Sequence, residues 1–163
     1  MRCSLRALCH HTCLLHRLNQ RAEPTAGQAI NSARRHRARR LRPIRLVLVG
    51  VSTGGPTTLE RILSDIKVPL AAPVLIALHT PNRYLKALTT RLSDRFGHDI
   101  GWLDRPTPLA PGQIVIAGAD YDVLVSSKNG QPTARPVAID PSRNWHPSVD
   151  RMVETAMEAF PAV

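Results

Sequence analysis

The sequence has little of what marks a secreted or membrane-bound protein. Its three cysteines, Cys3, Cys9 and Cys13, all lie near the N-terminus, so no disulfide can link the rest of the chain. No run approaches the roughly 18 apolar residues of a membrane span. The N-terminus also lacks the uninterrupted apolar stretch of a secretory signal. These absences favour a cytoplasmic protein without a membrane-spanning segment.

Aromatic residues are also scarce, at 4% of the chain, so we expect an aliphatic core. The 14 prolines and 9 glycines indicate many turns and few long helices. A chain of 163 residues is long enough for one domain with a sizeable core, but too short for two ordinary domains. We therefore expect a single folded domain built from short elements.

Acidic residues are nearly missing from residues 1–42, where ten Arg accompany a single acid, Glu23. The net charge of +10 belongs almost wholly to this segment, and the rest of the chain is nearly neutral. Because like charges repel, the pattern predicts a basic, disordered tail over residues 1–43 and a folded domain over residues 44–163. A nearly neutral domain argues against nucleic-acid binding, which needs a basic face on the folded part.

Other interpretations of the tail stay open. The segment Cys9-His10-His11-x-Cys13-x-x-His16 supplies enough ligands for a metal, but it lacks the paired spacing that closes a tetrahedral site. A nucleic-acid arm and an organellar transit peptide rest on composition alone. The tail is otherwise a linker remnant or the product of a wrongly chosen start. We predict no metal site.

From Leu46 the pattern becomes that of an α/β protein. Residues 46–49 and 73–78 are continuous apolar runs, as expected of parallel strands buried on both faces. Residues 57–66 and 81–96 follow these runs and carry apolar residues at helical spacing. The apolar positions are Leu59, Ile62, Leu63 and Ile66 in the first predicted helix and Tyr84, Leu85, Leu88, Leu92 and Phe96 in the second. The order strand, helix, strand, helix predicts right-handed crossovers onto a parallel sheet.

After Gly97 the pattern shifts to shorter strands, predicted over residues 100–103, 114–117, 121–126 and 134–139. The pair Asn129-Gly130 is a strong hairpin signal. A β-ribbon or meander inserted after two βα units fits this pattern, followed by a helix over residues 147–160. The expected fold class is α/β, with a doubly wound, mainly parallel sheet and a β-ribbon insertion.

The segment Gly50-Val51-Ser52-Thr53-Gly54-Gly55-Pro56 lies where the first predicted strand ends and the first helix begins. Small residues on each side let the backbone turn sharply and hold the Ser52 hydroxyl at the carboxyl edge of the sheet. The helix N-terminus offers free backbone N–H groups, beginning with that of Thr53, to an oxyanion. The same turn would also suit a phosphate, but the third glycine of Gly-x-Gly-x-x-Gly is missing. Ser52 is therefore a candidate nucleophile.

His79 ends the second predicted strand and is the candidate base. Adjacent parallel strands place their carboxyl ends side by side, so Ser52 and His79 are expected within hydrogen-bond reach. The alternative is a structural role, in which the histidine caps the end of its strand. His98 and His146 have no comparable placement. The carboxylates available to orient the imidazole all come from the predicted ribbon and last helix: Asp104, Asp120, Asp122, Asp140 and Asp150.

Together these motifs resemble the catalytic domain of chemotaxis protein-glutamate methylesterases over residues 45 to about 160. The motifs that carry the resemblance, in order, are Val49-Gly50-Val51-Ser52-Thr53-Gly54-Gly55-Pro56, His79-Thr80-Pro81, Leu109-x-Pro111-Gly112, Ile114-Val115-Ile116-Ala117-Gly118 and Pro147-Ser148-Val149-Asp150. The resemblance implies hydrolysis of γ-glutamyl methyl esters on the cytoplasmic helices of bacterial chemoreceptors, with deamidation of glutamine in some members. It implies Ser52 as nucleophile, His79 as general base, the Thr53 N–H as oxyanion donor, and no metal or organic cofactor.

The sequence departs from the family pattern in two places. Leu78-His79-Thr80-Pro81 stands where the family often has Gln-His-Met-Pro, which keeps the base and changes its surroundings. The family places its triad aspartate in a Gly-Met-Gly-x-Asp-Gly turn downstream of the last helix, and no such turn occurs before Val163. We therefore expect a domain truncated at its C-terminal end. Such a domain would have exposed apolar faces on its first two helices and an unpaired sheet edge.

The family's receiver domain is likewise missing, since the basic tail contains no acidic phosphorylation pocket. The sequence thus predicts a methylesterase-like serine hydrolase whose activity is weakened or lost because no triad aspartate is found in the chain. A non-catalytic fragment of the same fold, binding a receptor or another partner, is the alternative. A third interpretation is a gene fragment whose frame is interrupted at both ends.

Overall fold

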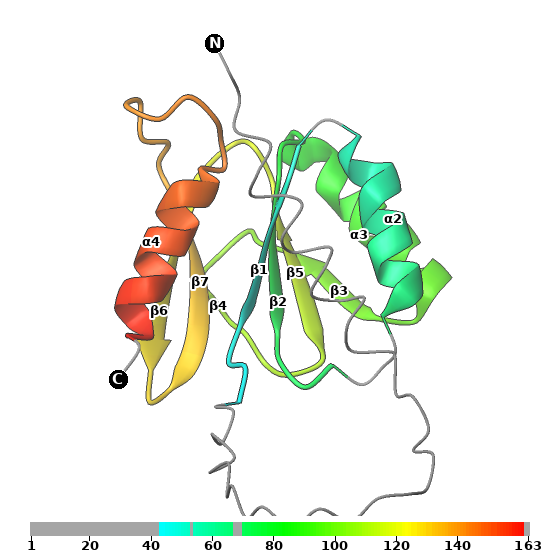
Figure 1. Cartoon of the computed structure of the whole chain (residues 1–163). Coiled ribbons are helices and arrows are strands. Elements are labelled where there is room, and N and C mark those ends of the chain that lie inside the picture. The colour runs from blue at the N-terminus through cyan, green and yellow to red at the C-terminus, as the bar shows by residue number, and fades with distance from the viewer. Residues whose placement is uncertain (1–42, 53, 67–69, 162–163) are drawn as a thin grey trace, which may run out of the picture. The chain divides into compact units, whose positions relative to one another are not determined.

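The computed structural model describes residues 43–52, 54–66 and 70–161. The predictions for the basic tail, including its metal and nucleic-acid alternatives, lie outside these residues. The described chain is an α/β domain (Figure 1). Its elements in chain order are β1 (Val47–Val51), α2 (Gly55–Asp65), β2 (Val74–Leu78), η1 (Asn82–Tyr84), α3 (Leu85–Phe96), β3 (Asp99–Trp102), β4 (Thr107–Pro108), β5 (Gln113–Ala117), β6 (Asp122–Lys128), β7 (Gln131–Val137) and α4 (Val149–Ala159).

Four strands form a parallel sheet in the order β1-β2-β5-β3. Every residue of β2 is buried because this strand lies inside the sheet with helices and strands packed on both faces. Where β1 pairs with β2, Val51 at the end of β1 lies beside Leu78 at the end of β2. The residues that follow these two positions therefore begin at the same edge of the sheet.

The remaining three strands form a small antiparallel sheet in the order β4-β7-β6. The hairpin between β6 and β7 turns at Asn129 and Gly130, whose φ angles of 53° and 81° are both positive. Two central residues with positive φ are typical of the type I′ turn, which matches the twist of paired strands. The predicted ribbon insertion and its hairpin signal are confirmed.

Helices cover both faces of the parallel sheet, as the doubly wound prediction requires. One face carries α2 and α3, whose Leu59, Leu63, Leu85 and Leu92 pack on the even-numbered residues of β2. On the other face, α4 and the antiparallel sheet pack on Leu75 and Ala77 of the same strand. In Figure 1 α4 accordingly lies on the opposite side of the sheet from α2 and α3.

Two strands belong to a different sheet from the one predicted. Residues 100–103 and 114–117 were expected in the ribbon, but β3 and β5 are members of the parallel sheet. The physical reason lies in β5, whose Ile114 and Ile116 enter one core while Val115 and Ala117 enter the other. A strand buried on both faces belongs inside a sheet, and its continuous apolar run is the same signal that β2 carries.

In the two predicted helices on the first face, not every apolar position that the helical spacing identifies is buried. Ile62 of α2 is 40% exposed and Tyr84, in the short helix η1, is 52% exposed. The polar Thr89 is buried instead, with its hydroxyl donating to the Leu85 carbonyl. None of the helices within the described ranges is both long and apolar enough to cross a membrane.

Candidate active site

Ser52 follows the last residue of β1, and its side chain is exposed at the carboxyl edge of the parallel sheet. The chain then turns at Gly54, which has a φ of +77° and directly precedes α2. The Gly55 N–H donates to the Ser52 carbonyl oxygen at 2.8 Å, which closes the turn. A side chain at Gly54 would be strained at this φ, so glycine permits the strand-to-helix turn that presents the serine.

His79 directly follows β2, and its main-chain N–H donates to the Val51 carbonyl at 3.1 Å. This bond extends the pairing of β1 and β2 to the last residue before Ser52. As a result, the Nδ1 atom of His79 lies 3.2 Å from the Oγ atom of Ser52. The structure thus brings together the two side chains that sequence reasoning paired. The third predicted participant, the Thr53 N–H, lies outside the described residues.

The other ring nitrogen of His79 has a main-chain partner. Its Nε2 atom lies 3.3 Å from the carbonyl oxygen of Pro147, just before α4. A carbonyl only accepts, so in the neutral ring Nε2 carries the hydrogen and Nδ1 carries the lone pair. The lone pair then faces the Ser52 hydroxyl, which is the arrangement a general base needs.

Trp145 stacks on His79, with ring centroids 6.1 Å apart and ring planes inclined by 15°. The side chain is 70% exposed, which is unusual for so large an apolar group. Sequence reasoning missed this neighbour because 66 residues separate the two rings. Its only signal in the sequence is a tryptophan in a polar loop of a chain that has two. The indole restricts one face of the imidazole.

None of the five candidate carboxylates binds His79; its side-chain hydrogen bonds within the described residues go to Ser52 and Pro147. We expected no candidate to follow a core parallel strand, which is wrong for two of them. Asp104 follows β3 and Asp120 follows β5, since both strands joined the parallel sheet. Asp120 instead accepts from the Asn82 N–H at 3.3 Å.

Asp122 is the one candidate with a fully buried side chain, and it accepts four hydrogen bonds. Its Oδ1 atom receives the Ser148 N–H at 2.8 Å and lies 3.0 Å from Nδ1 of His146. Its Oδ2 atom receives the Asp140 N–H at 2.9 Å and the Arg151 guanidinium at 3.0 Å. Burial alone would raise the pKa of this carboxyl, but the four donors outweigh it and lower the pKa to about 2.

Close packing at Gly50 brings the start of α4 to this edge of the sheet. A Cβ atom at Gly50 would lie 2.8 Å from the Cγ2 atom of Val149, which is closer than real side chains come. The glycine therefore lets the first residue of α4 rest on β1, two residues before Ser52. The approach of α4 also carries the Pro147 carbonyl to His79.

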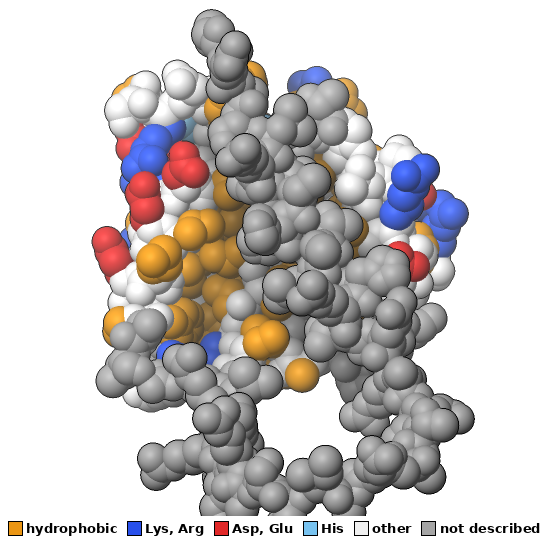
Figure 2. All heavy atoms as spheres, in the orientation of Figure 1, with side chains coloured by type: hydrophobic (Ala, Val, Ile, Leu, Met, Phe, Trp, Pro, Cys, Tyr) orange, Lys and Arg blue, Asp and Glu red, His pale blue; other side chains and the backbone are white. Residues whose placement is uncertain are grey.

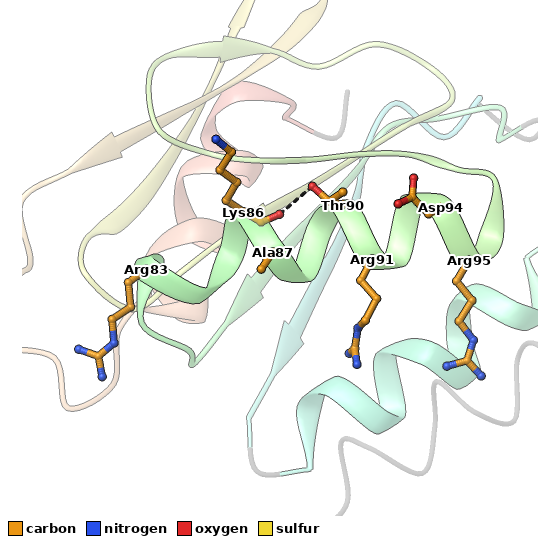
Figure 3. Close-up of a pocket in the computed structure, with 7 residues that line it drawn as sticks. All are labelled: Arg83, Lys86, Ala87, Thr90, Arg91, Asp94 and Arg95. Atoms are coloured by element: carbon orange, nitrogen blue, oxygen red, sulfur yellow. Dashed lines mark hydrogen bonds between the residues drawn. The ribbon is translucent and has the colours of Figure 1, made fainter.

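An open hollow runs along α3 and is separate from the serine and histidine. Its lining residues, shown in Figure 3, are Arg83, Lys86, Ala87, Thr90, Arg91, Asp94 and Arg95. Arg91 and Arg95 extend toward α2, where they bind the Glu60 carboxylate at 3.0 and 2.7 Å. Across residues 43–161, apart from the undescribed gaps, no three His, Cys, Asp or Glu side chains are arranged to hold a metal.

Comparison with known proteins gives consistent relatives. Protein-glutamate methylesterase/protein-glutamine glutaminase 3 of Rhodospirillum rubrum is 38% identical over 121 residues, covering 74% of this chain and 33% of the relative. The protein of the same name numbered 2 from Rhodopseudomonas palustris is 36% identical over 139 residues, covering 85% of this chain and 38% of the relative. The chain thus spans about a third of the length of these curated relatives.

A solved structure and a family match agree with these relatives. The crystal structure of the Thermotoga maritima CheB methylesterase catalytic domain superposes with a TM-score of 0.65 at 27% identity. The superposition covers 71% of this chain and 61% of that domain. Residues 47–163 match the family described as CheB methylesterase. This chain belongs to the CheB methylesterase family.

Proposed function

We propose that residues 44–163 form a protein-glutamate methylesterase-type serine hydrolase domain, with Ser52 as nucleophile and His79 as general base. The observation that carries the proposal is the 3.2 Å separation of Ser52 Oγ and His79 Nδ1 at two neighbouring strand ends. The Pro147 carbonyl supports it, because it leaves the Nδ1 lone pair free for the serine proton.

The proposed reaction is acyl transfer in two steps. Ser52 Oγ attacks the ester carbonyl while its proton moves to His79 Nδ1, and that proton then leaves with methanol. Water next attacks the acyl-serine and gives a proton to His79, which passes it to Ser52 Oγ as the acyl–oxygen bond breaks and the glutamate side chain is released as an acid that ionises. We assign the Thr53 main-chain N–H to the oxyanion, because the α2 N-terminus begins at this turn.

The substrate we propose is the γ-glutamyl methyl ester on the cytoplasmic helices of bacterial chemoreceptors, which makes this a cytoplasmic chemotaxis protein. The relatives are named for both a methylesterase and a glutaminase activity, so glutamine deamidation is a second reaction of the same site. Both reactions pass through an acyl-serine and differ in whether methanol or ammonia leaves.

The test uses the 163-residue chain and methylated receptor helices, with methanol release as the measurement. Ser52→Ala should abolish release, and His79→Gln should lower kcat by about 10²–10⁴-fold, the usual contribution of a general base. Ser64→Ala is the matched control, since its hydroxyl only donates to the Arg61 carbonyl on α2. Release that survives Ser52→Ala at the wild-type rate would contradict the proposal.

One observation favours a second function, a non-catalytic module that binds a receptor or another partner. Within the described residues His79 has no carboxylate partner, so its protonated form lacks the direct electrostatic support of a triad. Receptor binding that is unaffected by Ser52→Ala and His79→Gln, in a chain that releases no methanol, would select this alternative.

A further inference from the structure

The peptide bond between Pro147 and Ser148 joins a buried carboxylate to the candidate base. Its carbonyl oxygen lies 3.3 Å from Nε2 of His79, and its N–H donates to Oδ1 of Asp122 at 2.8 Å. We propose that Asp122 is a positioning residue for His79 and acts through this peptide bond. The catalytic side of this inference rests on the function proposed above.

The two hydrogen bonds lie on opposite ends of one peptide unit and reinforce each other. A peptide N–H bound to a carboxylate shifts electron density toward its own carbonyl oxygen, which then accepts more strongly. The full charge of Asp122 makes this effect larger than an amide or hydroxyl partner would. The result is a stronger bond from the peptide carbonyl to the His79 Nε2–H.

Asp122 also fixes where the peptide bond lies. His146 on one side and Arg151 on the other both bind the same carboxylate, at 3.0 Å each. The side chain is fully buried at the first residue of β6, in the well-packed antiparallel sheet. The segment that presents the Pro147 carbonyl is therefore held at three points by one rigid group.

These contacts fix the ring orientation and the tautomer of His79, although no carboxylate binds the ring directly. The Pro147 carbonyl accepts from Nε2, which leaves Nδ1 as acceptor for the Ser52 hydroxyl. Trp145 stacks on the same ring and belongs to the same segment that Asp122 anchors. Asp122 thus acts on the candidate base through two contacts of one loop.

Ser148 offers a matched pair of variants that separates this role from a merely structural one. Ser148→Ala removes only the side chain, which caps α4 by accepting the Arg151 N–H at 3.2 Å. Ser148→Pro removes the same cap and also the N–H that binds Asp122. The φ of Ser148 is −70°, which the proline ring allows, and the ring carbon that replaces the N–H displaces the Asp122 carboxylate from the peptide. The two variants therefore differ in whether the hydrogen bond from the residue 148 N–H to Asp122 can form.

The measurement is nitrogen-15 NMR of the histidine rings in the full chain at about pH 8.5, where an ordinary imidazole is neutral. The His79 signals are assigned by their loss in His79→Gln. In wild type and in Ser148→Ala we expect a hydrogen-bonded Hε2 signal and well-separated Nδ1 and Nε2 shifts. In Ser148→Pro the Hε2 signal should be lost to exchange with water and the two nitrogen shifts should converge.

Asp122→Asn should produce the same change, and the Ser148 pair remains decisive because substitution of a buried, ion-paired carboxylate also weakens the fold. Identical His79 signals in folded Ser148→Pro and Ser148→Ala would overturn the inference.

With a simple acetate ester as substrate, Ser148→Pro should lower kcat relative to Ser148→Ala by roughly tenfold, with KM unchanged. That size is typical of the outer partners of an oriented histidine in metal sites. Failure of all chains to hydrolyse the ester would count against the proposed function alone, since the NMR comparison needs no turnover.

Discussion

The lack of a side chain at Gly50 decides how closely α4 approaches the strand that carries Ser52. A Cβ atom there would lie 2.8 Å from Val149, the first residue of α4, which directly follows the segment that presents the Pro147 carbonyl. Sequence reasoning assigned this glycine to the sharp turn around the serine. The structure gives it a packing role as well, because the residue it faces comes from the other end of the chain.

We expect Gly50→Ala to lower the free energy of unfolding by about 1–3 kcal/mol, the usual cost of adding a methyl group to a filled site. The measurement is urea unfolding. Adding Val149→Ala to the same chain should restore much of the loss, since it removes the two atoms that the new methyl would meet. Gly101→Ala is the control, because nothing lies within 4 Å of a Cβ there. Equal destabilisation by both single substitutions would contradict the prediction.

Asp122 gives a second prediction, for acid stability. Its folded pKa of about 2 lies below the ordinary value of about 3.9, so the folded state holds the charged form more strongly than the unfolded state does. The resulting stabilisation, about 2 kcal/mol, is present above about pH 4 and is lost as the pH falls toward 2.

Urea unfolding of wild type and Asp122→Asn across this range checks the sign. The stability difference between the two chains should shrink as the pH falls through the window. Asp150→Asn removes a charge from an exposed position of α4 and should keep the wild-type pH dependence. A difference that stays constant from about pH 5 to pH 2 would show that protonation of Asp122 carries no such stabilisation.

At the scale of elements, helical spacing predicted where the helices lie but not which of their apolar residues are buried. In α2, Leu59 is fully buried whereas Ile62 is 40% exposed, although both occupy apolar positions of the same face. The reason is that the sheet and α3 cover only part of that face. Only the packed neighbours distinguish the two residues.

We therefore expect Leu59→Ala to lower the free energy of unfolding by about 2–5 kcal/mol, the cost of a cavity in a core. Ile62→Ala should change it by about 0.5 kcal/mol, as at most surface positions. Thermal unfolding of both variants at equal concentration is the measurement. Comparable losses from the two substitutions would mean that Ile62 is covered in solution.

Sheet membership was the least predictable property of the elements. β3 and β5 were expected in the ribbon because no predicted helix separates them from the later strands. Both strands belong to the parallel sheet because of long-range pairing, with Ile100 of β3 beside Ile114 of β5 and Leu75 of β2 beside Val115 of β5. The apolar run in β5 indicates a strand buried on both faces. Because β5 lies close in sequence to the strands of the ribbon, it was nevertheless assigned to the ribbon.

At the scale of the whole molecule, one face has an apolar groove beside an edge strand. Within the described residues β1 pairs only with β2, so it is the edge strand of the sheet there. Exposed apolar side chains include Ile62 of α2, and others, such as Ile44 and Met157, lie between β1 and α4. The groove is lined by Ile44, Arg45, Leu46, Leu48, Val153, Ala156, Met157 and Phe160. Figure 2 shows hydrophobic side chains gathered beside α4 on this face.

Such a surface predicts self-association at high protein concentration, since an open strand edge beside apolar side chains favours pairing between chains. Met157 is 69% exposed in the groove, so Met157→Lys should reduce association and leave the melting temperature nearly unchanged. Sedimentation over a range of concentrations measures this. Tyr84→Lys, at a 52% exposed position outside the groove, is the control. A wild-type chain that stays monomeric throughout would contradict the prediction.

The sequence by itself determined the fold class and the two side chains that meet at the sheet edge. A buried strand, a glycine-rich turn and a histidine after the next strand are local patterns, and parallel pairing then forces Ser52 and His79 together. Only the tertiary structure decided which groups contact and orient the histidine ring. The Pro147 carbonyl, the stacked Trp145 and the buried Asp122 lie 68, 66 and 43 residues from His79. No local pattern encodes these contacts, because they depend on how α4 packs against Gly50 and how β6 pairs with β7.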